Sequence, residues 1–241
     1  GAANVGLAYG TSLSSSIGFT SAGAMSITQT SGDLVATPFA AQSLQFQSLG
    51  GNVVFAGGST FGPAPVSVVG AGNALFNSGT VTFNGPLTST LPLAVSGGSL
   101  VANATVTAPA LDLGSGSASF QVAPVFGNVT QFGGTLSIST GTPFDISSGT
   151  WTVSGGQLNL PGAGTTIASG ATLAVAGGSV SHGSQLAVLG TLALSSGTLT
   201  GAGPINNSGT ITKSGTGVFT LAQAVNNSGT VSSAAGTLRL T

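Results

Sequence analysis

The sequence predicts an all-β fold, a parallel β-solenoid (β-helix) with about 20 residues per coil and roughly 12 coils. Three observations lead to this prediction. A short apolar phrase recurs along the chain, one turn pentapeptide occurs twice, and the composition combines 41 glycines and 41% hydrophobic residues with only 2% charged residues. Such a chain has enough apolar surface to form a core, provided that these residues gather on one side of each strand.

The recurring phrase is an alternation followed by a turn: apolar, any, apolar, any, Gly or Ser, Gly, any, apolar. Its copies begin at Leu93, Leu111, Trp151, Leu173 and Leu192. Apolar residues at alternate positions are typical of a strand with one buried face, and the glycines allow the chain to turn sharply. Residues one coil apart lie above one another in a solenoid, so we expect these five residues to form an interior core stack, with Trp151 packed inside rather than stacked on a sugar.

The pentapeptide Asn-Asn-Ser-Gly-Thr begins at Asn206 and again at Asn226, one predicted coil later. Gly, Asn and Ser are typical turn residues. We therefore expect Asn206 to lie over Asn226 and Asn207 to lie over Asn227. Their amide groups would then form a structural ladder along the axis, as stacked asparagines do in cross-β arrays.

Two regions follow one another along the chain. Residues 1–50 fit the period poorly and are predicted to form irregular N-terminal coils or a cap, whereas residues 51–241 form the solenoid body, and we interpret both as one continuous domain. No helix is expected, because even the helix-tolerant segment from Phe39 alternates Leu44 with Phe46. The phenylalanines predicted to point into the core are Phe55, Phe76, Phe83, Phe120, Phe132 and Phe219.

Charged residues are nearly absent. They are Asp33, Asp112, Asp145, Lys213 and Arg239, and the formal net charge is -1. A chain without a basic patch or a long apolar run is not expected to bind nucleic acid or to insert directly into a membrane. The absence of cysteine excludes disulfides and thiolate metal sites. The first residues lack a basic segment followed by an apolar one, so no signal peptide is expected.

The few titratable residues do not form a predicted active site. About two coils separate Asp112 from Asp145, which leaves a paired-carboxylate hydrolase open on distance alone. However, Asp112 is expected to face outward from a strand and Asp145 to lie in a turn. His182 lies in a Gly/Ser-rich segment and is predicted to be a solvated turn residue rather than a metal ligand. We therefore expect no enzyme and no catalytic, cofactor-binding or metal site.

The repeats of the second half resemble those of a known group of proteins. The phrases GTLALSSGTLTGAG from Gly190, NNSGTIT from Asn206 and NNSGTVSSAAGTLRL from Asn226 are similar to the repeats of bacterial surface β-helices, namely autotransporter passengers and filamentous-haemagglutinin-like adhesins. The resemblance covers roughly residues 93 to 241. It implies a right-handed parallel β-helix, extracellular display on the bacterial cell surface, and a role in adhesion, biofilm formation or surface fibres.

A structural or adhesive role is the first functional hypothesis. So few charges give weak protection against pairing between the open coils of two copies. The last residues, from Gly236 to Thr241, stop inside a strand phrase. We therefore expect a non-enzymatic extracellular β-solenoid that either associates end to end with further copies or continues into a longer chain. Host or matrix glycans are the partners expected for such an adhesin.

The alternative is a protein that binds an ice or carbohydrate surface through a flat threonine array. Thr-x-Thr pairs begin at Thr80, Thr105, Thr150, Thr198 and Thr210. The intervals between them are 25, 45, 48 and 12 residues, which is too uneven for one regular face. The preference of strands for branched side chains is a purely structural explanation of these pairs.

Overall fold

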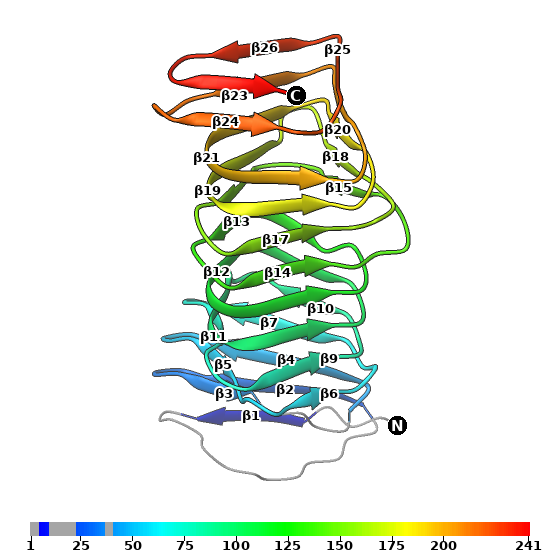
Figure 1. Cartoon of the computed structure of the whole chain (residues 1–241). Coiled ribbons are helices and arrows are strands. Elements are labelled where there is room, and N and C mark those ends of the chain that lie inside the picture. Colours follow the sequence, from blue (N-terminus) through cyan, green and yellow to red (C-terminus); the bar gives the residue numbers. More distant parts are fainter. Residues whose placement is uncertain (1–4, 10–22, 37–40) are drawn as a thin grey trace. The chain divides into compact units, whose positions relative to one another are not determined.

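The structure is a computed structural model in which residues 5–9, 23–36 and 41–241 are described. It confirms the predicted fold class, since the chain is an all-β parallel β-solenoid of about 11 turns of ~19 residues (Figure 1). These turns are slightly fewer and shorter than the sequence predicts. Every regular element in the described ranges is a β-strand, and no helix there is long and apolar enough to span a bilayer.

The chain forms two compact units. Unit 1 comprises Gly1–Asp112 and Gly116–Val125, and unit 2 comprises Leu113–Ser115 and Phe126–Thr241. Both contain the same kind of coil, in which short parallel strands alternate with turns. The strand β12 (Val106–Phe120) contributes residues to both units.

Unit 1 stacks its strands in three parallel columns. The first column contains β1 (Val5–Tyr9), β2 (Ala24–Gln29), β4 (Ser43–Ser48), β7 (Val66–Gly70) and β10 (Leu87–Ser89), and β12 follows β10. The second contains β3 (Leu34–Ala36), β5 (Val53–Phe55), β8 (Ala74–Phe76) and the first part of β11 (Leu93–Ala102). The third contains β6 (Thr60–Phe61), β9 (Thr80–Phe83) and the second part of β11.

Unit 2 repeats this arrangement. Its first column contains β13 (Val125–Gln131), β16 (Thr150–Val153), the first parts of β19 (Thr172–His182) and β21 (Thr191–Gly201), β23 (Thr210–Lys213) and β26 (Thr230–Ser233). The second contains β14 (Thr135–Ile138), β17 (Gln157–Leu160) and the second parts of β19 and β21, with the pair β24 (Val218–Leu221) and β27 (Thr237–Leu240) next to β21. The third contains β15 (Phe144–Ile146), β18 (Thr165–Ile167), β20 (Leu186–Val188), β22 (Ile205–Asn207) and β25 (Val225–Asn227).

The N-terminal region is only partly described. Of residues 1–50, the ranges 23–36 and 41–50 contain β2, β3 and β4, which pair in register with one another or with the following strands of unit 1. The residues 1–4, 10–22 and 37–40 lie outside the described residues. An irregular region or cap over residues 1–50 therefore stays a prediction.

The core of unit 1 is built around stacked phenylalanine rings. Phe55 and Phe76 lie one coil apart with their ring centroids 4.8 Å apart and their planes 1° from parallel. Phe61 and Phe83 stack in the same way at 4.7 Å. Phe46 meets Phe55 edge to face at 6.1 Å. Because the strands are in register, identical residues one coil apart bring their rings into contact, and the second and third columns each hold one such stacked pair.

The predicted interior phenylalanines are buried with one exception. Phe132 is 65% exposed, so this prediction was wrong. The preceding residue, Gln131, takes the inward position instead, and its Nε2 donates to the carbonyl oxygens of Gly134 at 3.2 Å and Gln157 at 2.9 Å. The next turn therefore receives its hydrogen bonds from inside the coil, and Phe132 is left on the outer surface.

Other inward polar side chains also donate hydrogen bonds to the carbonyl oxygens of the turn that follows their strand. Gln29 Nε2 donates to the carbonyl oxygen of Ser31 at 2.8 Å, and Ser89 Oγ donates to the carbonyl oxygen of Leu91 at 2.8 Å. Both donors lie at the end of a strand and are buried. A sharp turn leaves backbone carbonyls without strand partners, and a buried carbonyl needs a donor. We refer to residues in this position as turn-closing residues.

Candidate functional site

The repeated asparagines of unit 2 form an outward ladder. Asn206 in β22 pairs in register with Asn226 in β25. Asn226 Nδ2 donates to Asn206 Oδ1 at 2.8 Å, and Asn206 Nδ2 donates to Gln185 Oε1 at 3.1 Å. Three consecutive coils are therefore joined by side-chain amides on the outer surface.

The second pair of asparagines consists of the last residues of the same two strands, Asn207 in β22 and Asn227 in β25. Asn207 is 2% exposed, and its Nδ2 donates to Asn227 Oδ1 at 2.6 Å and to the carbonyl oxygen of Thr230 at 3.0 Å. Asn227 Nδ2 donates to the carbonyl oxygen of Gly229 at 3.2 Å. This pair therefore links two coils and also donates hydrogen bonds to backbone carbonyls at the turn that follows Asn227.

The residues predicted as the core stack are all 2% exposed or less. Trp151, Leu173 and Leu192 pair in register in the first column of unit 2. Leu93 in β11 and Leu111 in β12 belong to unit 1. The indole ring of Trp151 lies in the core beside the rings of Phe126 and Phe144, so it is not presented to a ligand on the surface.

The three aspartates occupy outward positions. Asp33 Oδ1 accepts hydrogen bonds from the backbone N–H of Asn52 at 2.8 Å and from its Nδ2 at 3.1 Å. Asp112 lies in unit 1 at the outward position of β12 that the sequence predicts. Asp145 lies in β15 of unit 2 and not in a turn, so that prediction was wrong. Its two neighbours are buried, which sets the strand alternation and turns the carboxylate outward.

His182 is buried inside unit 2, so the prediction of a solvated turn residue was wrong. It is the last residue of β19, takes the inward position after Val180 and is 3% exposed. Its Nδ1 donates to the carbonyl oxygen of Ser184 at 2.5 Å, which leaves Nε2 to accept from Gln223 Nε2 at 3.4 Å. The ring covers Gly201, where a Cβ atom would collide with it. His182 is thus a turn-closing residue that also reaches Gln223, two coils further along the chain, through the space that Gly201 of the next coil leaves free.

The burial of His182 predicts that acid destabilises the protein. Desolvation lowers the pKa of His182 below its usual value of 6.5, against the opposing effect of the hydrogen bond to Ser184. The unfolded chain therefore binds this proton at a higher pH than the folded chain, and the free energy of unfolding falls as the pH is lowered through 6.5. Chemical denaturation between pH 7 and pH 5 should show this fall, with a slope of at most about 1.4 kcal/mol per pH unit.

The His182→Gln variant is the control for this prediction. The chain contains one histidine, so no other imidazole titrates between pH 5 and pH 7. The variant should therefore have nearly the same free energy of unfolding at both pH values. A protein that is more stable at pH 5 than at pH 7 would contradict the prediction.

Lys213 is completely buried in unit 2, which the sequence pattern does not indicate. It is the last residue of β23 and pairs in register with Leu194 and Ser233. Its Nζ donates to the carbonyl oxygens of Ser214 and Gly215, the latter at 2.8 Å. Lys213 is therefore another turn-closing residue.

Two substitutions of Lys213 separate packing from hydrogen bonding. Lys213→Met keeps most of the buried stem but leaves the carbonyl oxygens of Ser214 and Gly215 without their donor. We expect its free energy of unfolding to fall by about 1–2 kcal/mol, because removal of a buried charge offsets part of the cost of the unpaired carbonyls. Lys213→Ala also removes the buried stem and should lower the free energy of unfolding by about 2–4 kcal/mol. Urea denaturation of both variants measures the difference, and equal losses would show that the carbonyl bonds matter more than the packing.

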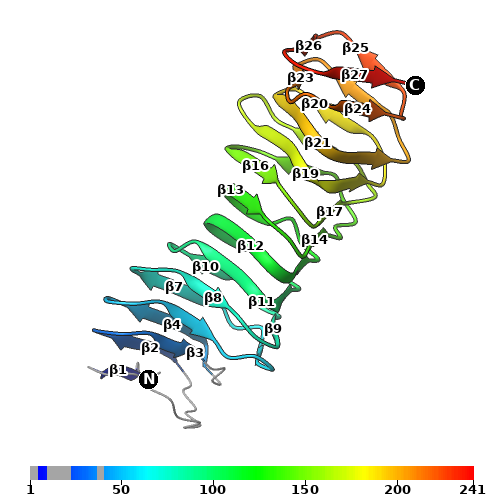
Figure 2. The same cartoon turned by 60° about the vertical axis from the view of Figure 1, so that its left-hand side comes forward.

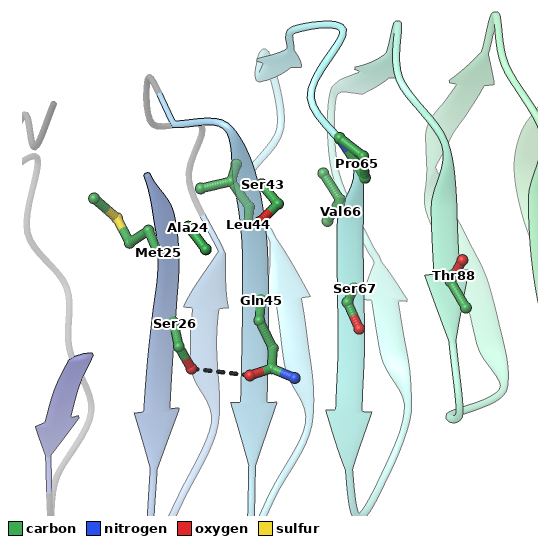
Figure 3. A pocket seen from close by; sticks show the side chains of 10 residues that line it. All are labelled: Ala24, Met25, Ser26, Ser43, Leu44, Gln45, Pro65, Val66, Ser67 and Thr88. Atoms are coloured by element: carbon green, nitrogen blue, oxygen red, sulfur yellow. Dashed lines mark hydrogen bonds between the residues drawn. The ribbon is translucent and has the colours of Figure 1, made fainter. Parts of the chain in front are cut away.

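A groove with a volume of about 600 Å³ crosses the first column of unit 1 (Figure 3). Ser26, Gln45, Ser67 and Thr88 form an outward row in it, with one residue from each of β2, β4, β7 and β10. The exposed ring of Pro65 and parts of buried apolar residues complete the lining. All the side chains that line the groove are uncharged.

A threonine array lies on the first column of unit 2, where Figure 2 shows the successive strands. It consists of residues that pair in register from coil to coil: Thr150, Thr172, Thr191, Thr210 and Thr230. Each of the last four donates its backbone N–H, at 2.9 Å, to the carbonyl oxygen of the residue before the preceding threonine. The same backbone bond is therefore repeated from coil to coil, which fixes the spacing of the array.

Sequence reasoning missed this array because it counted Thr-x-Thr pairs. Of those pairs, Thr150 and Thr210 lie in the array, whereas Thr198 lies in the second column of unit 2 and Thr80 in unit 1. The array itself uses single threonines at the start of strands, and four of the five follow a glycine. A search for Gly-Thr at the coil period would have found most of it.

Within the part of the chain that the structure describes, no group of three or more His, Cys, Asp or Glu residues could hold a metal ion. The polar residues that do form groups are those of the uncharged ladders, the groove of unit 1 and the threonine array of unit 2.

The structure confirms one part of the resemblance to bacterial surface β-helices, namely the solenoid fold. Comparisons with protein-family models, with curated proteins and with solved structures found no match to this chain.

Proposed function

We propose that this chain is a non-enzymatic, extracellular structural or adhesive β-solenoid, as a segment or a self-associating subunit of a bacterial surface fibre or adhesin. The observation that carries the proposal is that polar side chains on the surface join one coil to the next. Asn159 Nδ2 donates to Ser137 Oγ at 3.2 Å, and Ser181 Oγ donates to Asn159 Oδ1 at 2.9 Å. In unit 1, Asn103 Nδ2 donates to Asn84 Oδ1 at 2.8 Å. These groups reinforce a scaffold along its axis.

The two buried side chains that could act in acid-base chemistry, His182 and Lys213, instead stabilise the fold. The imidazole of His182 and the ammonium group of Lys213 each donate to backbone carbonyls of the following turn. General acid-base catalysis needs such groups within reach of a substrate. Their burial at the ends of β19 and β23, where they bind the following turn, therefore favours a structural role.

Self-association forms part of the proposal. The chain has few charges to keep copies apart. In the final coil, Val231 and Leu240 are 37% and 51% exposed, although Val231 pairs in register with the buried Ile211. Further residues of a longer chain or a second copy would cover this apolar surface.

Light scattering and electron microscopy of the purified chain test the self-associating form. We expect the scattering mass to rise with concentration and particles to join end to end. Val231→Lys should suppress this association, because it places an ammonium group on the surface of the final coil. Val218→Lys makes the same change at a side chain that is 67% exposed and outward, and it should have little effect. Monomers at every concentration would rule out the fibre subunit.

Binding to an ice or solid-carbohydrate surface is a second candidate, and the threonine array favours it. A crystalline surface repeats the same groups at a constant interval, so its protein partner needs a regular array. Strands in register give the array a step of about 4.8 Å between coils. Each threonine presents a hydroxyl and a methyl group, and the neighbouring outward row also has small side chains: Thr152, Ala174, Ala193, Thr212 and Ser232.

Thermal hysteresis of a dilute solution tests the ice surface, and retention on crystalline cellulose tests the carbohydrate surface. Thr191→Tyr places a large ring in the middle of the array and should abolish the effect. Thr200→Tyr introduces the same ring on β21 in the second column and should leave it unchanged. The absence of both thermal hysteresis and retention in the wild type would exclude this candidate.

A further inference from the structure

Two glutamines of β4 are held by their oxygen atoms alone. Ser26 Oγ donates to Gln45 Oε1 at 3.0 Å, and Thr28 Oγ1 donates to Gln47 Oε1 at 3.2 Å. Figure 3 shows the nitrogen of Gln45 on the side away from Ser26. Among the described residues no acceptor is bound to the Nε2 group of either glutamine. Each amide therefore has a fixed orientation and free N–H donors.

Two of the other amides in the ladders differ in this respect. Asn159 donates through Nδ2 to Ser137 and accepts through Oδ1 from Ser181. Asn206 likewise uses its nitrogen toward Gln185 and its oxygen toward the next coil. Asn159 and Asn206 use both ends of the amide between coils, whereas Gln45 and Gln47, like Asn84 and Gln185, accept through oxygen and keep their N–H donors. Of these four residues, Gln45 lines the groove.

The free donors lie beside further polar groups with a regular spacing. Gln45 and Gln47 are alternate outward residues of one strand, so their amides are about 7 Å apart along it. Ser67 and Thr88 continue the row of Gln45 at steps of about 4.8 Å in the following coils. The exposed ring of Pro65 adds an apolar contact beside this row.

We propose that a chain of an uncharged polysaccharide binds in the groove of unit 1 and extends beyond it along β4, with Gln45 in the groove and Gln47 next to it on the strand as the main hydrogen-bond donors. A polysaccharide repeats oxygen acceptors at regular intervals and has C–H faces that pack on an apolar ring. The lining has no charged side chain that would favour an ionic polymer. This inference rests on the adhesive role proposed above and gives it a ligand class and a site.

Affinity electrophoresis of the full chain in gels that contain a soluble polysaccharide tests the proposal. The probes are a linear β-glucan and a mannan as neutral polymers, and polygalacturonate as a charged one. We expect at least one neutral polymer to retard the wild type and the charged polymer to have no effect. The variant with both Gln45→Leu and Gln47→Leu should bind the neutral polymer at least about tenfold more weakly, because two hydrogen-bond donors are lost.

The control variant is Gln121→Leu, which makes the same change at an exposed residue of unit 1 outside the groove. It should bind as the wild type does, and the circular dichroism spectrum should be the same for all three proteins. Retardation that survives the double substitution, or equal retardation by the charged polymer, would overturn the proposal. So would the absence of retardation by either neutral polymer. Light scattering on the same samples reports self-association independently, so the glycan site can fail while the scaffold role stands.

Discussion

Phe76→Ala should lower the free energy of unfolding of unit 1 by about 3–5 kcal/mol, the range found when a buried aromatic ring is removed. Phe76 is completely buried, stacks on Phe55 at 4.8 Å and meets Phe83 edge to face at 6.2 Å. The variant loses both ring contacts and leaves a cavity that strands in fixed register cannot easily fill. Guanidinium denaturation followed by circular dichroism measures the loss.

Two variants control for the loss of the ring. Phe132→Ala makes the same change where the side chain is 65% exposed and should alter the free energy of unfolding by less than about 0.5 kcal/mol. Phe76→Leu fills part of the cavity and should fall between the two alanine variants. If Phe76→Ala lost no more than Phe132→Ala, the stacked rings would not be a source of stability.

Gly149→Ala should destabilise unit 2 by about 2–4 kcal/mol through two separate effects. Gly149 has a φ of 68°, where an alanine is strained. Its Cβ would also collide with the carbonyl oxygen of Gly127 in the neighbouring coil. Relief of this collision would displace the segment in which the Thr150 N–H donates to Asn128 Oδ1 at 2.9 Å. Thermal and urea denaturation of the variant measure the combined effect.

Gly170→Ala isolates the strain from the collision. Gly170 has a φ of 84°, but a Cβ there would have no atom within 4 Å. We expect a loss of about 1–2 kcal/mol for this variant, since only the backbone conformation is penalised. Equal losses for the two variants would mean that the close approach between coils at Gly149 does not limit the packing.

The coil and its strands were predictable because they depend on periodicity. The interval that brings Asn206 over Asn226 also places the flanking Ile205 over Val225 and Ile211 over Val231, and the structure has both of these apolar pairs in register. Apolar alternation sets which face of a strand is buried, and the repeat interval sets which residues meet in neighbouring coils. The strand at Phe46 was predicted for the same reason.

The inward polar residues were not predictable from that pattern. Gln131, His182 and Lys213 occupy positions where alternation alone would place an apolar side chain, and each donates to a carbonyl oxygen beyond the end of its strand. These residues are placed there because the carbonyl oxygens of the following turn need a hydrogen-bond donor. The spacing of apolar residues carries no information about that need. The threonine array escaped notice for a different reason, because its members are single threonines at the starts of strands that recur at about the coil period, and a search for Thr-x-Thr pairs does not detect them.

The groove of unit 1 shows a second limit of sequence reasoning. Its polar row takes one outward residue from each of four strands, and Ser26, Gln45, Ser67 and Thr88 share no local motif. Only the register of the coils brings them together. A site of this kind becomes visible once the alignment of successive coils is known.

The backbone bonds between coils have a mechanical consequence. Adjacent coils are joined by short rows of parallel hydrogen bonds, and Thr230 to Gly209 and Thr241 to Leu221 are such bonds in the final coil. A pull on the C-terminal residue loads the rows of one coil before those of the next. Each coil whose rows give way releases about 60 Å of extended chain, the length of one turn of ~19 residues. Under tension, unit 2 should lengthen in small, nearly equal steps and absorb work at each of them, as a tether exposed to shear would need to do.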